Sequence, residues 1–126
     1  MAILFEDTLG HMESSDSVGT NHRFGTGDVH RTLAGRGVRH TQTPVSGSRI
    51  HAVQMFIDLP PVLRQAPVQT FHLAARDVPI HAGADFRIRL LVGEAFGLSS
   101  PLKLPQNMLI IEGFSTFKCR PLVNVQ

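Results

Sequence analysis

The segment 27–44 could build a binding site, because a glycine-rich turn in it leads to two polar side chains. The turn contains Gly35 and Gly37, at which a positive φ costs little. His40 and Gln42 follow, two residues apart. In an extended strand, side chains alternate between faces, so both would point to the same side. Imidazole is a common metal ligand, so the sequence predicts a candidate site at His40 and Gln42.

This segment resembles the second cupin motif in the form that the pirin family carries. The matching residues are Gly27-Asp28, Ala34-Gly35-Arg36-Gly37, His40 and Pro44. The resemblance extends both ways, and matches cover most of residues 3–102. It implies an all-β fold, a cupin-type (jelly-roll) β-barrel that corresponds to part of the N-terminal cupin domain of a two-barrel pirin.

The resemblance also implies a metal ion inside the barrel, held by three His and one Glu. Two of these His would come from a His-x-His motif, which occurs nowhere in this sequence. The other two ligands would come from His-x-Glu, where the chain has His40 and, in place of the Glu, Gln42. We therefore expect no cofactor in the isolated chain, and iron, nickel or copper at His40 and Gln42 only if the site is completed.

The other histidines are predicted to be structural. His11, His22 and His30 have spacings that match no zinc-ligand pattern, and no cysteine lies near them. His51 falls on an apolar run and is predicted to be a satisfied core histidine.

Length and composition bound the other function classes. The chain has 126 residues, which fits one domain, and its formal charge of +2 does not imply a nucleic acid or an anionic membrane as partner. A single cysteine, Cys119, excludes an internal disulfide. The N-terminal residues do not resemble a signal peptide, and no apolar run reaches the length of a membrane span, so we expect a cytoplasmic protein.

Short apolar runs with frequent Gly and Pro predict the all-β fold directly, with roughly eight or more strands. Residues 49–59 are apolar on both faces, so we predict a covered strand over 50–59 at the centre of the sheet. Residues 86–92 alternate, and we predict a half-buried strand with Arg87 and Arg89 on its wet side. Residues 2–5 and 108–111 are further predicted strands, and residues 62–69 could form one helical turn.

The resemblance divides the chain into residues 1–104, a partial N-terminal cupin barrel, and residues 105–126, a crossing segment and C-terminal tail. An incomplete barrel would leave strand edges unpaired, and such edges pair with other chains. We therefore expect a homo-oligomer through exposed strand edges, with residues 121–125 as a segment that one chain could donate to another.

Three functions from different classes follow. The leading one is a pirin-like cupin without metal-dependent catalysis, with a binding, regulatory or vestigial role and a protein as a further partner. The alternative is a metal-dependent quercetin-type (flavonol) 2,3-dioxygenase. A nucleic-acid-associated module rests on Arg31, Arg36, Arg39 and His40, and it is disfavoured because no aromatic residues are interleaved with these cations.

Overall fold

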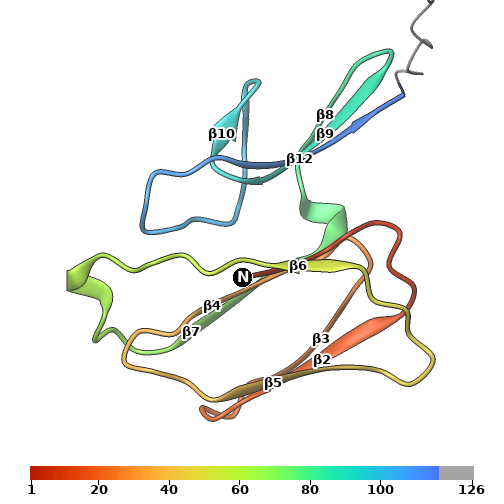
Figure 1. Cartoon of the computed structure of the whole chain (residues 1–126). Helices are drawn as coiled ribbons and strands as arrows, with labels where there is room; N and C mark the ends of the chain where they lie inside the picture. The colour runs from red at the N-terminus through yellow and green to blue at the C-terminus, as the bar shows by residue number, and fades with distance from the viewer. Residues whose placement is uncertain (117–126) are drawn as a thin grey trace, which may run out of the picture.

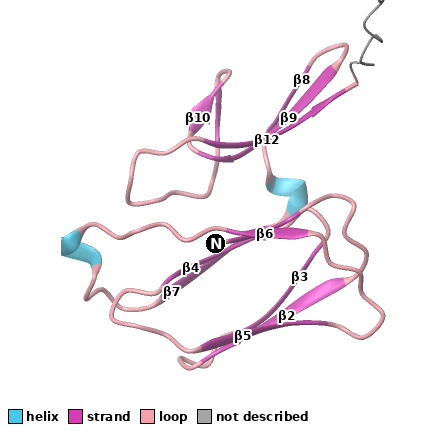
Figure 2. Ribbon diagram, viewed as in Figure 1, coloured by secondary structure: helices cyan, strands magenta, loops and turns pink. Residues whose placement is uncertain are grey.

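A computed structural model of the chain describes residues 1–116, and the fold in this range is almost entirely β, as predicted (Figures 1 and 2). The strands are β1 (Ala2–Leu4), β2 (His11–Asp16), β3 (Asn21–Gly25), β4 (Val29–Leu33), β5 (His40–Pro44), β6 (Ala52–Gln54), β7 (Gln69–Leu73), β8 (Ile80–Ala82), β9 (Phe86–Val92), β10 (Glu94–Ala95), β11 (Leu98–Ser99) and β12 (Ile110–Ser115). Two 3-10 turns, η1 (Pro61–Leu63) and η2 (Ala75–Asp77), complete the described elements. Cys119 and residues 121–125 lie outside the described residues.

Two antiparallel sheets, which lie one above the other in Figure 1, form the larger part of the molecule. One has the order β6-β1-β4-β7 and the other the order β3-β2-β5. Strand β1 is buried along its whole length, because its alternate side chains enter two different cores. Ala2 and Leu4 pack against Phe24 of β3, whereas Ile3 packs against Val29 on the other side of the sheet.

A third sheet, with the order β12-β9-β8, is joined to the larger part through η2 and carries the small hairpin β10–β11 beside it (Figure 1). Leu91, Val92 and Leu102 from this part of the chain join the core that contains Ile3 and Val29. The third sheet is therefore packed onto the first, and β1 and β4 lie between the two cores.

The prediction of a central strand over residues 50–59 is wrong. Only Ala52–Gln54 is a strand, and this strand, β6, is an edge whose three residues are all exposed. It pairs with β1 alone, and Phe56 beyond it is 90% exposed. The apolar pattern of this segment therefore did not identify the centre of the sheet, which β1 and β4 occupy.

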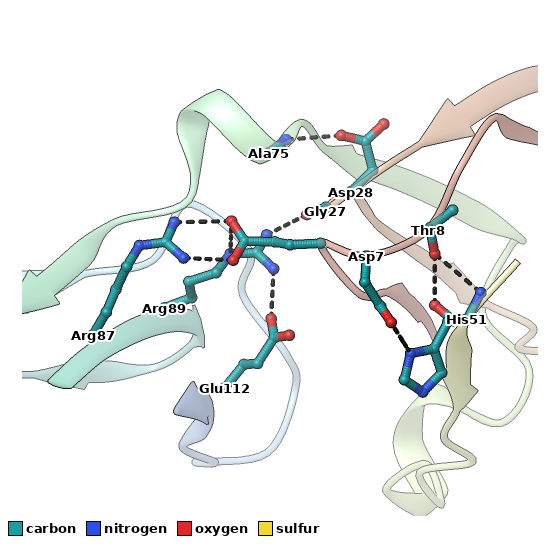
Figure 3. A network of polar contacts seen from close by, with 10 residues as sticks. Asp7, Thr8, Gly27, Asp28, His51, Ala75, Arg87, Arg89 and Glu112 are labelled. Atoms are coloured by element: carbon teal, nitrogen blue, oxygen red, sulfur yellow. Dashed lines mark hydrogen bonds and ion pairs between the residues drawn. The ribbon is translucent and has the colours of Figure 1, made fainter. Parts of the chain in front are cut away.

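The prediction of a wet arginine face on β9 is also wrong for Arg89, whose relative exposure is only 1%. Its guanidinium donates to Glu112 Oε2 at 2.5 Å and to the Gly27 carbonyl oxygen (Figure 3). Both terminal nitrogens of Arg87, on the same face, donate hydrogen bonds to the Glu6 carboxylate. Carboxylates thus cover this face of β9, while Phe86 on the opposite face is exposed.

Other expectations differ only in extent. Residues 11–25 form the regular β2–β3 hairpin. The run 108–111 contributes only the start of β12, and the helical turn expected in 62–69 is the 3-10 turn η1. Within residues 1–116, no helix is long and apolar enough to cross a membrane.

Candidate functional site

The glycine-rich turn between β4 and β5 has the tight geometry that the sequence predicted. Gly35 and Gly37 have φ values of 50° and 111°, a region that favours glycine. A Cβ at Gly35 would overlap the carbonyl oxygen of Ala66, which also accepts a hydrogen bond of 3.2 Å from the Arg36 amide. The turn is therefore held against the segment that follows η1, and this contact fixes where β5 begins.

Strand β5 delivers His40 and Gln42 to one cavity, so the prediction that both face the same side is confirmed. The ladder with β2 sets their positions, because His40 pairs with Asp16 and Gln42 pairs with Ser14. The cavity has a volume of about 180 Å³ and lies between β5 and the sheet that contains β1 and β4. His40 is exposed at its rim, and Gln42 is half-buried.

The structure adds His30 of β4 to this cavity, although the sequence predicts a structural role for this residue. His30 is only 3% exposed, and its Nδ1 atom has no hydrogen-bond partner within the described chain. Its Nε2 atom lies 3.5 Å from the hydroxyl of Thr32, which also lines the cavity. Burial lowers the pKa of His30 to about 4, with help from the neighbouring imidazoles. His30 is therefore neutral at pH 7.

Polar groups in the cavity wall are imidazoles, amides and a hydroxyl, and the side chains that line it within the described chain include no carboxylate and no thiol. Gln54 supplies a second amide opposite Gln42 on the neighbouring sheet. The remainder of the wall is mainly apolar, with Leu33, Val38, Met55, Phe56, Ile57 and Leu59.

This donor set does not fit the metal site that the resemblance implies. Divalent metal ions in proteins are held by several imidazole, carboxylate or thiolate ligands together. Within residues 1–116, no group of three or more His, Cys, Asp or Glu is placed to hold a metal ion. Gln42 offers only a neutral amide where the resemblance implies a carboxylate.

His30 also belongs to a cluster of three imidazoles between the two sheets. The ring centroids of His22 and His30 are 5.6 Å apart, and those of His22 and His72 are 4.3 Å apart. His30 stacks on Phe24 with a centroid distance of 4.9 Å. The pKa of His22 is lowered by burial first and by His72 second. Strands β4 and β7 of one sheet and β3 of the facing sheet thus bring together histidines that the sequence keeps apart.

Asp28 is the carboxylate next to this cluster, and it fixes the turn before β4. Its two oxygens accept hydrogen bonds of 2.8 Å from the amides of Gly25 and Ala75 (Figure 3 shows the second). His72 Nε2 lies 3.1 Å from Asp28 Oδ2, but without hydrogen-bond geometry. Asp28 therefore connects the turn before β4 to the start of η2.

His51 is not the core histidine that the sequence predicted. Its side chain is exposed, and its Nδ1 atom lies 2.8 Å from Asp7 Oδ1 (Figure 3). The bond to His51 holds the pKa of the Asp7 carboxyl below its usual value. The centroid of its ring lies 4.6 Å from that of the Phe5 ring. His51 is thus exposed although its neighbours in the sequence are apolar.

A larger hollow of about 520 Å³ lies between β10 and residues 102–109. Its charged groups are Glu94 and Lys103, which lie 3.7 Å apart and pair with each other. Its lining within residues 1–116 includes no imidazole, so the smaller cavity at His40 is the better candidate for chemistry. Of the cations proposed for nucleic acid, Arg31 is partly buried and donates to the Lys103 carbonyl oxygen, whereas Arg36 and Arg39 are exposed.

Sequence comparison connects this arrangement with known proteins. Residues 2–57 match the family model described as Pirin. Human pirin is 26% identical over 91 residues, which cover 72% of this chain and 31% of pirin. A pirin-like protein of Caulobacter vibrioides is 29% identical over 105 residues, which cover 79% of this chain and 35% of that protein. The chain thus spans about a third of the length of these curated relatives.

Structure comparison gives the same architecture. The crystal structure of GK1651 from Geobacillus kaustophilus has a TM-score of 0.81 and 28% identity, covering 90% of this chain and 45% of that one. A quercetin 2,3-dioxygenase from Acinetobacter baumannii has a TM-score of 0.82 and 25% identity, covering 91% and 37% of the two chains. The resemblance to the pirin family and the cupin-type fold are both confirmed.

Proposed function

Because residues 2–57 match the pirin family, we propose that this chain is a cupin-type binding protein that works without metal-dependent catalysis. The cavity at His30, His40 and Gln42 is its binding site. A ligand would enter past the exposed His40 and make its deepest contact with the buried His30.

One observation supports this proposal above the others: the cavity keeps its polar groups but lacks a carboxylate. A Glu at position 42 would provide a charged ligand for iron, nickel or copper, whereas Gln42 provides a neutral amide. The amide can still donate and accept hydrogen bonds, so the wall suits an organic ligand better than a cation.

Elemental analysis of the purified full chain tests this proposal. We expect less than about a tenth of an equivalent of iron, nickel or copper after dialysis, since a tight site needs several ligands. The protein should also fail to consume quercetin under air when each metal is added in turn. Stoichiometric metal that is lost in His40→Ala, or quercetin turnover that needs the metal, would overturn the proposal.

A second candidate is a metal-dependent quercetin 2,3-dioxygenase. It is supported by the structural neighbour from Acinetobacter baumannii that carries this name. This candidate requires metal ligands beyond those of residues 1–116, supplied by another chain. The turnover measurement above separates it from the leading proposal.

We further propose that the chain forms a homo-oligomer through exposed strand edges, and that residues 1–104 and 105–126 act as a barrel part and a crossing segment. Apolar side chains support the association, because Phe86, Phe96 and Ile111 are all exposed around the third sheet. Exposed apolar patches of this kind mark interfaces. Light scattering of the full chain at micromolar concentration tests this assembly.

A further inference from the structure

We propose that the cavity between β4 and β5 binds a small organic carboxylate with a single apolar ring, and that the carboxylate lies against His30, Gln42 and Gln54. This inference rests on the proposed function, because it names the class of ligand that the metal-free site would take. The cavity would then hold an anion where the family resemblance implies a metal ion.

The donors and charges of the cavity wall suit an anion. Imidazole, amide and hydroxyl groups from His30, Gln42, Gln54 and Thr32 can all donate a hydrogen bond to an oxygen anion. The side chains that line the cavity in the described chain include no Asp or Glu that would repel the anion. Hydrogen bonds to a charged acceptor are roughly twice as strong as neutral ones, so this set favours a carboxylate over a neutral ligand.

His30 has a ring nitrogen without a hydrogen-bond partner in the described chain. Nδ1 of His30 is buried and has no partner among the described residues. A buried polar atom without a partner has lost its hydrogen bonds to water without replacement, so a ligand that hydrogen-bonds to it gains affinity. The atom belongs to the side chain that forms the buried end of the cavity wall.

A positively charged side chain lies close to the cavity. The side chain of Arg31 lines a small adjoining hollow of about 50 Å³, which shares Thr32, Leu33 and Ile57 with the main cavity. Its Nε atom is also buried and has no partner within the described chain. A guanidinium beside a cavity without carboxylates raises the local positive potential, which attracts an anion.

Size and apolar lining limit the rest of the ligand. A volume of about 180 Å³ is below the ~300–1,000 Å³ of sites that hold drug-sized molecules, so one ring and one carboxylate fill it. The ring would lie against the apolar wall of Leu33, Met55 and Ile57.

Binding should couple to protonation of His30. The titratable and charged groups around His30 are His22 on β3, His72 on β7, His40 on β5 and the Met1 amino group, with Asp28 beside His72 and Asp16 at the end of β2. Neither carboxylate is hydrogen-bonded to His30 in the described chain, so the bound carboxylate would be the first anion in direct contact with the ring. Its arrival should therefore stabilise the protonated ring and draw in a proton.

Benzoate and benzamide form the matched probes, because they differ in the charge and not in the ring. We expect isothermal titration of the full chain to show benzoate binding with an affinity at least about tenfold above that of benzamide, the ratio that a charge-assisted bond provides. Benzoate affinity should rise about threefold between pH 7.5 and 5.5 through linked proton uptake, and this rise should disappear in His30→Gln. In two-dimensional NMR, the side-chain amides of Gln42 and Gln54 should shift on addition of benzoate.

A charge-matched pair of variants checks the location. Gln42→Glu should weaken benzoate binding at least about tenfold through like-charge repulsion, whereas Gln65→Glu at an exposed site outside the cavity should not. Equal affinity for benzamide, or shifts confined to residues outside the cavity, would overturn the inference even if Gln42→Glu failed to fold. A metal-free protein that ignores benzoate would overturn the inference alone, while stoichiometric metal would overturn the proposed function with it.

Discussion

Arg89 donates a hydrogen bond of 2.5 Å to Glu112 across the β9–β12 ladder, at a guanidinium that is 1% exposed. The same guanidinium reaches the carbonyl oxygen of Gly27, at the start of the segment that leads to the cavity (Figure 3). The hydrogen bond from Arg89 to Gly27 therefore joins the third sheet to the turn that precedes β4. The pair of Arg89 and Glu112 places a charge in the interior, where a chain of this size normally puts apolar side chains.

Replacement of Arg89 by methionine should destabilise the chain by about 3–5 kcal/mol, because breaking a buried ion pair leaves Glu112 without its partner. Urea denaturation followed by circular dichroism measures this loss. Arg76→Met is the control, since the Arg76 side chain is 84% exposed and should change the stability by less than about 0.5 kcal/mol. Similar midpoints for the two variants would show that the Arg89 pair contributes little.

Replacement of Gly35 by alanine should destabilise the chain more than the same change at Gly37. Both residues have positive φ, which costs a non-glycine residue about 1–2 kcal/mol. A Cβ at Gly35 would also overlap the Ala66 carbonyl oxygen, whereas nothing lies within 4 Å of a Cβ at Gly37. A lower denaturation midpoint for Gly35→Ala than for Gly37→Ala would support the tight contact at Ala66, and equal midpoints would contradict it.

The stability of the chain should fall as the pH is lowered from 6.5 to about 4, because the pKa of His30 is lowered to about 4 by burial. Between these two pH values His30 is protonated in the unfolded chain and neutral in the folded chain. Lowering the pH therefore favours the unfolded state. A lowering from 6.5 to about 4 corresponds to a loss of about 3 kcal/mol from this group. Urea midpoints measured at several pH values between 7 and 4 should show this slope.

A variant with His30→Gln should have a smaller slope over the same pH range, since a group that does not titrate replaces the imidazole. His11→Gln is the matched control at an exposed position, and its slope should equal that of the original chain. If His30→Gln kept the full slope, the pH dependence would have to come from groups other than His30.

Replacement of Gln42 by glutamate should raise the affinity for nickel or iron about tenfold, because a carboxylate is a charged ligand and the amide is neutral. Titration of the dialysed full chain with each metal measures the change. Gln65→Glu adds the same charge at an exposed site and should leave the affinity unchanged. An equal gain in both variants would show a general charge effect rather than a site at His40.

Association of the chain should weaken when Phe96 is replaced by asparagine. Phe96 is 53% exposed, has a φ of 55° and stacks on His81 with a centroid distance of 4.5 Å. Asparagine tolerates this φ, so the variant should fold at least as well while it loses the apolar surface. Light scattering at micromolar concentration should show a smaller mass for Phe96→Asn than for Phe56→Asn, a control at another exposed phenylalanine.

A version of the chain that ends at Lys118 separates this surface from the donated segment proposed at residues 121–125. If the shortened chain associates as well as the original, the tail is not required. If the original chain is monomeric at these concentrations, the proposed homo-oligomer is wrong.

The sequence alone determined the fold class, the positions of the turn glycines and the shared face of His40 and Gln42. Short apolar runs separated by Gly and Pro predicted the all-β fold. The alternation of apolar and charged side chains in residues 86–92 predicted the extent of β9. The spacing of His40 and Gln42 was sufficient to put both on one face, because alternation along a strand needs no information from the rest of the chain. The turn glycines were equally readable, since a positive φ is a local property.

Only the tertiary structure decided which face of each strand is buried. Alternation along β9 shows only that Arg89 and its neighbours in sequence face opposite sides. Arg89 can be buried because Glu112 and the Gly27 carbonyl oxygen, both distant in the sequence, accept hydrogen bonds from its guanidinium. The apolar pattern of residues 50–59 predicts a strand with both faces covered. Within the described chain, β6 is instead an edge strand with exposed residues, because it pairs with β1 alone. His30 joined the cavity because β4 and β5 belong to facing sheets, and the pairing of strands distant in sequence sets that geometry.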